Sequence, residues 1–209
     1  MKNNYPIIAL LAIVIGALVA CNAQKQADRI ASRNEHKTLF PDYPFDVKLA
    51  RTALTEGATT IEGVVFTKPK TKLGYSAPLA ERIYGRNVLV TLIPVTPYFE
   101  QWYDMRKHKE NKLTSVFMSD TAFKYRLTTT SDDYGRFKFT RMKPGKYFLQ
   151  AFLDWGETKS YKENVGSGET GYGTVNYYQW KNYTQNHQDR LEKFVEVAPN
   201  ETSVSVKLK

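Results

Sequence analysis

The side chains that most often carry enzymatic or metal chemistry are scarce in this sequence. It holds three histidines and one cysteine, and the patterns His-x-x-Glu, His-Glu-x-x-His and Gly-x-Ser-x-Gly are all absent. The histidines, His36, His108 and His187, lie in polar stretches far apart along the chain. Zinc sites and nucleophile–base pairs need such residues in a close, defined constellation. We therefore expect no catalytic residue, no metal site and no cofactor, and we predict that the protein is not an enzyme.

Two polar clusters have simpler structural explanations than ligand binding. Asp132 and Asp133 carry the oxygens that calcium prefers, but Asp residues followed by Gly135 are also the ordinary composition of a turn. The glycines of residues 166–173 have the spacing of a phosphate-binding loop, yet no strand–helix unit surrounds them. We expect a turn at the first cluster and a flexible loop at the second.

Cys21, the single cysteine, lies where a different chemistry needs one. It follows Lys2, an apolar run from Ile7 to Ala20, and the sequence Leu18-Val19-Ala20. Such a run is short for a permanent membrane span and typical of a secretory signal. Leu-Val-Ala-Cys resembles the lipobox of bacterial lipoproteins, which implies cleavage before Cys21, diacylation of its thiol and acylation of its new N-terminus. The alternative is an uncleaved signal anchor with a chance cysteine.

The residue after the cysteine and the net charge bear on location and partners. In lipoproteins, Asp at this position favours the inner membrane, so Asn22 implies an outer-membrane anchor facing the periplasm if the cell is Gram-negative. The chain has 30 Lys and Arg against 21 Asp and Glu, a formal net charge of +9. Both signs are mixed along most of the sequence, and an exported protein rarely meets nucleic acid. We expect the membrane as a partner and no nucleic acid.

Polarity divides the chain into three parts. Residues 1–20 form the predicted signal peptide, and residues 21–45 form the acylated cysteine and a polar tether that ends in an aromatic, proline-containing strap. Residues 46–209 have the β-branched and alternating patterns of strands. Helical spacing of aromatics over residues 96–112 predicts one helix between two strands. The predicted strands are 59–66, 87–95, 123–130, 136–140, 146–155, 175–180, 193–197 and 203–208.

The most informative stretch is residues 130–149, TSDDYGRFKFTRMKPGKYFL. Asp132, Asp133 and Gly135 favour a turn, and Pro144-Gly145 favours a second one. Between and after these turns, period-two alternation should bury four side chains in a core, namely Phe137, Phe139, Tyr147 and Leu149. The stretch therefore predicts strand, turn, short strand, turn, strand.

This motif resembles the carboxypeptidase regulatory-like domain. That family shows T-x-x-D-G-x-F-x-F-x-x-L-x-P-G-x-Y-x-L, and here Tyr134 is inserted before Gly135 and Met142 replaces the usual Leu. The resemblance covers about residues 59–155 and implies a transthyretin-like (prealbumin-like) fold. We predict an all-β, transthyretin-like/Ig-like β-sandwich of about seven strands with one inserted helix. Since the resemblance concerns an accessory domain, peptidase activity is not implied.

Residues 155–183 are unusually rich in aromatic side chains among Gly, Asn, Gln and Lys. One explanation is a hairpin whose aromatics pack on the sandwich. The other is a binding surface, because Tyr and Trp give large contact areas at low entropic cost. On the second hypothesis the binding residues are Tyr172, Tyr178, Trp180 and Tyr183, next to a loop at residues 156–173.

Three functional hypotheses remain open for such a protein. The first is a non-enzymatic envelope lipoprotein that acts as a structural or protein-interaction module. The second is a glycan-binding lipoprotein that uses the aromatic-rich 155–183 region. The third is an assembly lipoprotein of a secretion apparatus, since some of those also carry a transthyretin-like sandwich. An exposed aromatic stripe with free polar neighbours would favour the second hypothesis, and a flat apolar patch would favour the first or third.

Overall fold

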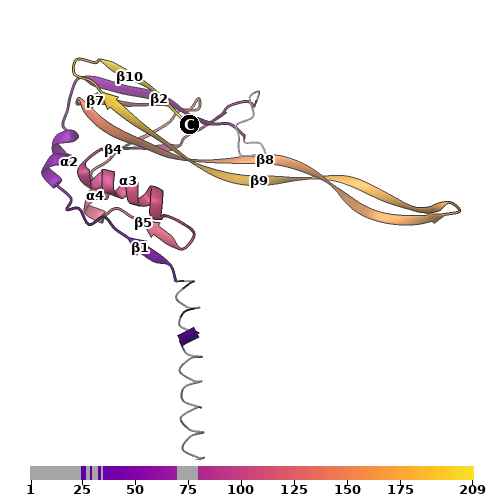
Figure 1. Cartoon of the computed structure of the whole chain (residues 1–209). Coiled ribbons are helices and arrows are strands. Elements are labelled where there is room, and N and C mark those ends of the chain that lie inside the picture. Colours follow the sequence, from indigo (N-terminus) through magenta and orange to yellow (C-terminus); the bar gives the residue numbers. More distant parts are fainter. Residues whose placement is uncertain (1–24, 27–28, 30–32, 34, 70–79) are drawn as a thin grey trace, which may run out of the picture. The chain divides into compact units, whose positions relative to one another are not determined.

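A computed structural model describes residues 25–26, 29, 33, 35–69 and 80–209 of the chain (Figure 1). Cys21 and the predicted signal peptide lie outside these residues. The chain forms two compact units, Met1–Pro44 with Glu100–Ser119, and Phe45–Phe99 with Asp120–Lys209. Helix α3 (Pro97–Lys109) begins in the second unit and continues in the first.

The smaller unit is built around a two-stranded parallel pairing. β1 (Lys37–Leu39), at the end of the segment we interpret as a tether, pairs with β5 (Thr114–Val116). The indole Nε1 of Trp102 donates a hydrogen bond to the Val116 carbonyl oxygen at 3.2 Å. The guanidinium of the buried Arg106 lies 4.4 Å from the centre of the Trp102 ring. Aromatic residues of α3 thus serve as core in this unit.

The larger unit is a sandwich of two sheets, which confirms the predicted fold class. One sheet has the order β10-β2-β3, with β7 also paired to β2, and the other has the order β6-β4-β8-β9. Their bounds are β2 (Thr59–Thr67), β3 (Ile83–Tyr84), β4 (Leu89–Pro94), β6 (Leu127–Thr130), β7 (Arg136–Met142), β8 (Gly145–Thr170), β9 (Gly173–Val197) and β10 (Ser203–Leu208). β10 runs parallel to β2, while every other pairing in the two sheets is antiparallel.

The core lies between the inward faces of the two sheets. Phe137, Phe139, Tyr147 and Leu149, the four side chains predicted to be buried, are each at most 5% exposed. They pack in one cluster with apolar side chains of both sheets, such as Ile61, Val90, Leu92, Val195, Val206 and Leu208. The alternation in the sequence therefore identified the inward faces of two strands correctly, β7 in one sheet and β8 in the other.

The turn before β7 is held by one carboxylate and one glycine. Asp132 Oδ1 accepts hydrogen bonds from the backbone N–H groups of Tyr134 and Arg136, at 2.9 and 2.8 Å. The bond from the Arg136 N–H contributes most to lowering the pKa of Asp132 below its ordinary value of 3.8. Gly135 has φ +75°, and a Cβ there would lie 2.5 Å from the Val65 carbonyl oxygen. Asp132 thus has a structural role, as its place in a turn predicted.

The predicted helix and one predicted strand had different outcomes. α3 begins at Pro97, where the Thr96 hydroxyl accepts from the Phe99 N–H at 3.3 Å, and its position between strands is confirmed. The strand predicted at 123–130 was wrong in its first half, because α4 (Asp120–Lys124) precedes β6. A further short helix, α2 (Val47–Ala53), was not predicted; Asp46 caps it by accepting from the Leu49 N–H at 3.0 Å.

Candidate functional site

The second sheet extends into a long two-stranded arm. β8 pairs with β4 only over Tyr147–Ala151, whereas β8 and β9 pair with each other from Gly145↔Val197 to Thr170↔Gly173. We call residues 156–186 the arm (Figure 1). No side chain of the arm is buried, so it adds nothing to the sandwich core. The flexible loop predicted at 156–173 was therefore wrong: those residues are paired β-strand up to the turn.

The local sequence explains the turn at the tip of the arm and the β-bulge near it. Gly171 and Tyr172 form a two-residue turn between the paired residues Thr170 and Gly173, and Gly173 has φ +134°. The Thr170 hydroxyl donates to the Gly173 carbonyl oxygen at 2.8 Å, and Tyr172 at the tip is fully exposed. Val165 is the extra residue of a β-bulge, which strengthens the local twist of the ribbon.

On one face of the arm, side chains of the two strands contact each other, although Tyr161, Tyr177 and Tyr183 are still 44%, 56% and 48% exposed. The β9 residues of this face have odd numbers. At the base of the arm, the rings of Trp155 and His187 stack with their centres 4.3 Å apart. Farther out, Tyr161 and Tyr183 meet edge to face at 6.0 Å. Lys181 donates a hydrogen bond to the Glu163 carboxylate, and this bond is the main cause of the raised pKa of Lys181. We call this the packed face.

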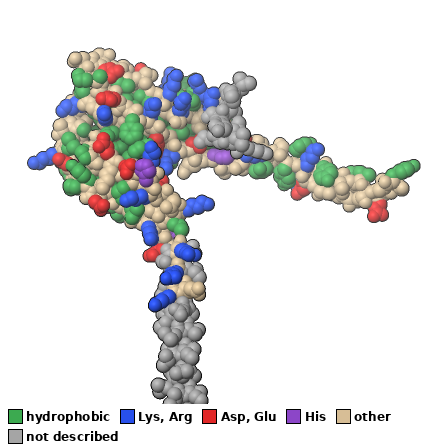
Figure 2. All heavy atoms as spheres, in the orientation of Figure 1, with side chains coloured by type: hydrophobic (Ala, Val, Ile, Leu, Met, Phe, Trp, Pro, Cys, Tyr) green, Lys and Arg blue, Asp and Glu red, His purple; other side chains and the backbone are tan. Residues whose placement is uncertain are grey.

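The opposite face presents its aromatic side chains to solvent. Tyr178 and Trp180 are two residues apart in β9, so they share this face, and they are 58% and 64% exposed. The Lys162 ammonium lies 5.1 Å from the Trp180 ring centre, and a Ser160–Asn182 hydrogen bond of 2.7 Å flanks the pair. We call this the open face; Figure 2 shows green side chains spaced along the arm.

The structure divides the four predicted binding residues among three places. Tyr178 and Trp180 lie together on the open face, whereas Tyr183 lies on the packed face against Tyr161. Tyr172 is at the tip, six residues from Tyr178, which is roughly 20 Å along a strand. Their role in binding stays a prediction. Sequence reasoning missed Lys162, because only the register Lys162↔Trp180 places it beside the indole.

The chemical character of the arm suits non-covalent contact. Its three lysines, at positions 159, 162 and 181, balance its three glutamates, at positions 157, 163 and 169, and most of its remaining residues carry amides or hydroxyls. Within the described ranges, no three His, Cys, Asp or Glu side chains gather in a way that could hold a metal ion. Among the same residues, none of the helices is long and apolar enough to cross a membrane.

Comparisons with known proteins give little further information. No protein-family model matches the chain, and no curated protein matches it significantly, so the resemblance to carboxypeptidase regulatory-like domains stays a prediction. A crystal structure of a "putative carbohydrate binding protein" from Pseudomonas aeruginosa is similar, with 19% sequence identity and a TM-score of 0.49. The similarity covers 81% of this chain and 99% of that one. Function must therefore be inferred from this chain's own residues.

Proposed function

We propose that this protein is a non-enzymatic, lipid-anchored module of the cell envelope that uses its arm to bind a partner protein. The observation that supports this most is the pair Tyr178 and Trp180, exposed side by side on an arm whose side chains have no part in the core. Large aromatic side chains are enriched where proteins bind one another, and they are costly to leave in water without a role.

The backbone of the arm supports a protein partner in particular. Among the residues that the structure describes, β8 and β9 beyond Phe152 pair with each other and with no third strand, so the outer edge of each strand presents N–H and C=O groups without a described strand partner. Soluble proteins normally shorten, cover or charge such edges, because they accept a further strand from another chain. An exposed pair of long edges with aromatic side chains between them is suited to strand addition by a partner.

The envelope location rests on Cys21 and is tested separately. Metabolic labelling of cells with a fatty-acid analogue should tag the wild-type chain and leave Cys21→Ser unlabelled, because the thiol is the acceptor in the proposed diacylation. Membrane fractionation should place only the labelled chain with the outer membrane. Equal labelling of both chains would refute the anchor.

Partner binding is tested by removing the open-face aromatics. We expect the double variant Tyr178→Ala with Trp180→Ala to reduce capture of crosslinked envelope partners at least about tenfold, since two exposed anchors of this type contribute most of an interface's affinity. Its thermal midpoint should stay within a few degrees of the wild type's. The matched control is Tyr161→Ala with Tyr183→Ala, which removes two aromatics from the packed face.

The control defines what each result means for the proposal. Capture should survive in the packed-face variant, because those two rings mainly contact each other. Equal losses in both variants would mean that the open face has no special role. An unfolded open-face variant would mean that Tyr178 and Trp180 stabilise the fold, and the site assignment would then be wrong.

A glycan is the second candidate partner, and one contact favours it. Trp180 offers a flat ring with the Lys162 ammonium over one face and the hydrogen-bonded Ser160 and Asn182 side chains nearby, and such a ring can stack on a sugar while polar neighbours hydrogen-bond its hydroxyls. The same two double variants distinguish the candidates when purified glycan strands replace protein extracts. Loss of glycan retention with unchanged protein capture would favour the glycan.

A further inference from the structure

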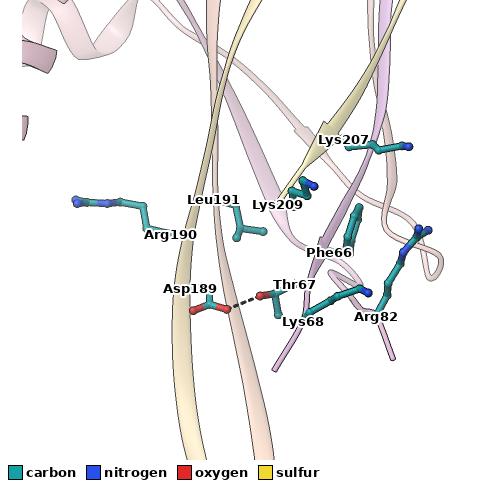
Figure 3. Close-up of a pocket in the computed structure, with 9 residues that line it drawn as sticks. All are labelled: Phe66, Thr67, Lys68, Arg82, Asp189, Arg190, Leu191, Lys207 and Lys209. Carbon is teal, nitrogen blue, oxygen red and sulfur yellow. Dashed lines mark hydrogen bonds between the residues drawn. The ribbon is translucent and has the colours of Figure 1, made fainter. Parts of the chain in front are cut away.

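A cleft separate from the arm's open face lies on the sandwich, at the end where β2 and β10 finish (Figure 3). It has a volume of about 640 Å³. Its floor includes the buried ring of Phe66, and its walls carry Lys68, Arg82, Lys207 and Lys209. In Figure 3 these basic side chains lie on one side of the cleft, around the Phe66 ring. We call these four residues the basic cluster.

The sheet register explains why these cations meet. β10 runs parallel to β2 with Lys207 opposite Val64 and Leu208 opposite Val65, so β10 ends beside Phe66. β3 is antiparallel to β2 with Thr67 opposite Ile83, which brings Arg82 next to Lys68. Three segments distant in sequence therefore contribute to the cluster, and no run of basic residues in the sequence would reveal it.

The one acidic side chain of the cleft is already engaged elsewhere. Asp189 Oδ2 accepts hydrogen bonds from the Thr67 hydroxyl at 2.6 Å and from the Trp155 indole Nε1 at 3.0 Å. Figure 3 shows this bond between Asp189 and Thr67, with Thr67 next to Lys68 of the basic cluster. Throughout the described part of the chain, no carboxylate forms an ion pair with Lys68, Arg82 or Lys207. Among the described residues, these three cations therefore have no ion-pair partner.

The two arginines that line this cleft are oriented differently. The Arg82 guanidinium is held 4.9 Å from the Phe66 ring centre, which orders it beside the lysines. Arg190, which also borders the cleft, points away from the cluster in Figure 3 and has Glu192 as an ion-pair partner at 3.4 Å. Positive charges gathered in a concavity raise the local electrostatic potential, which favours the binding of an anion. A bound anion in turn reduces the repulsion among the cations.

From this geometry we infer that the cleft binds a phosphate group with two or more negative charges, or a phosphate ester. Lysine ammonium groups bind phosphate oxygens as point charges, and an arginine guanidinium donates to two oxygens at once. A phosphodiester headgroup of an anionic lipid and a free phosphate share this chemistry. The inference concerns a site on the sandwich and does not depend on partner binding by the arm.

The test uses the full chain in micelles of a non-ionic detergent and isothermal titration calorimetry. The probes are inorganic pyrophosphate and, separately, dihexanoyl phosphatidylglycerol. We expect at least one probe to bind, with affinity that falls as salt is raised. The triple variant Lys68→Gln, Arg82→Gln, Lys207→Gln should weaken binding at least about tenfold, since it removes three of the four cluster charges. Tighter binding of pyrophosphate would identify free phosphate as the ligand type, and tighter binding of dihexanoyl phosphatidylglycerol would identify the lipid headgroup.

A matched variant removes the same charge elsewhere. Lys138→Gln, Lys146→Gln, Lys193→Gln changes three exposed lysines of β7, β8 and β9 and should leave affinity within about twofold of the wild type. No binding of either probe up to about 10 mM, or equal losses in both triple variants, would overturn the inference. If the cluster variant fails to fold, the single variant Lys207→Glu replaces it and must weaken binding while the wild-type far-ultraviolet spectrum is retained.

Discussion

Phe139→Ala should lower the free energy of unfolding by about 3–5 kcal/mol, the usual loss when a large aromatic is truncated inside a packed core. Phe139 is 5% exposed on β7, and its ring lies 6.1 Å from that of Phe137. It faces Ile61 across the β2–β7 pairing, so the cavity would open between the two sheets. Urea denaturation followed by fluorescence measures the change directly.

Phe152→Ala is the matched control for this prediction. Phe152 lies on β8 in the second sheet and is 50% exposed, so its truncation removes little buried surface and should cost less than about 1 kcal/mol. A loss below about 1 kcal/mol for Phe139→Ala as well would place that residue at the surface. The proposed inward face of β7 would then be wrong.

Excision of the arm should abolish partner capture and leave the sandwich folded. Replacing residues 158–184 with Asn-Gly joins Glu157 to Gln185, which face each other in the register, through a two-residue turn. The excised segment has no buried side chain, so the thermal midpoint should move by no more than about 4 °C. Differential scanning calorimetry checks the fold, and crosslinking in isolated envelopes checks capture.

The remaining base of the arm provides the internal control for the excision. Trp155, His187 and Asp189 are retained, so three contacts persist: the ring stack, the Trp155–Asp189 bond between β8 and β9, and the Thr67–Asp189 bond that joins the base to β2. Normal capture by the shortened chain would place the partner site on the sandwich or in the N-terminal segment. Loss of the cooperative unfolding transition would show that the arm is needed for stability, which contradicts its proposed role.

The sandwich was predictable because its strands are half buried. Where one face meets the core, alternation marks it, and Phe137, Phe139, Tyr147 and Leu149 were assigned correctly from this signal. Turn chemistry was equally local, since Gly135 takes the positive φ that its place after two aspartates predicted. The strand predicted to begin at Phe123 was wrong because it also rested on alternation. Alternation over a few residues does not distinguish a strand from one turn of helix, and Phe123 lies in α4.

A hairpin was one of the two explanations for the aromatic-rich region, but the length of the arm and the exposure of its aromatics were not predicted, because neither of its faces is buried. No apolar period of two arises in a ribbon with solvent on both sides, and its glycines and serines then suggest a loop. The backbone pairing of β8 with β9 holds the arm together, and cross-strand contacts such as Tyr161 with Tyr183 become visible only once the register is known. The sequence predicted a strand only over residues 175–180, whereas β9 continues past Tyr183. Tyr183 and Trp180 are three residues apart in one strand, so they lie on opposite faces.

The length of the arm turns small movements at its base into large ones at its tip. From Gly156 to Thr170 the ribbon is roughly 45 Å long, so a tilt of about 5° at the base displaces Tyr172 by about 4 Å. The Trp155–His187 stack lies at the base of the arm, where Asp189 accepts hydrogen bonds from Thr67 and Trp155. A tilt of the whole arm would turn about this point. Loss of these hydrogen bonds would widen the volume that the tip explores, so the position of the open face depends on residues at the base of the arm.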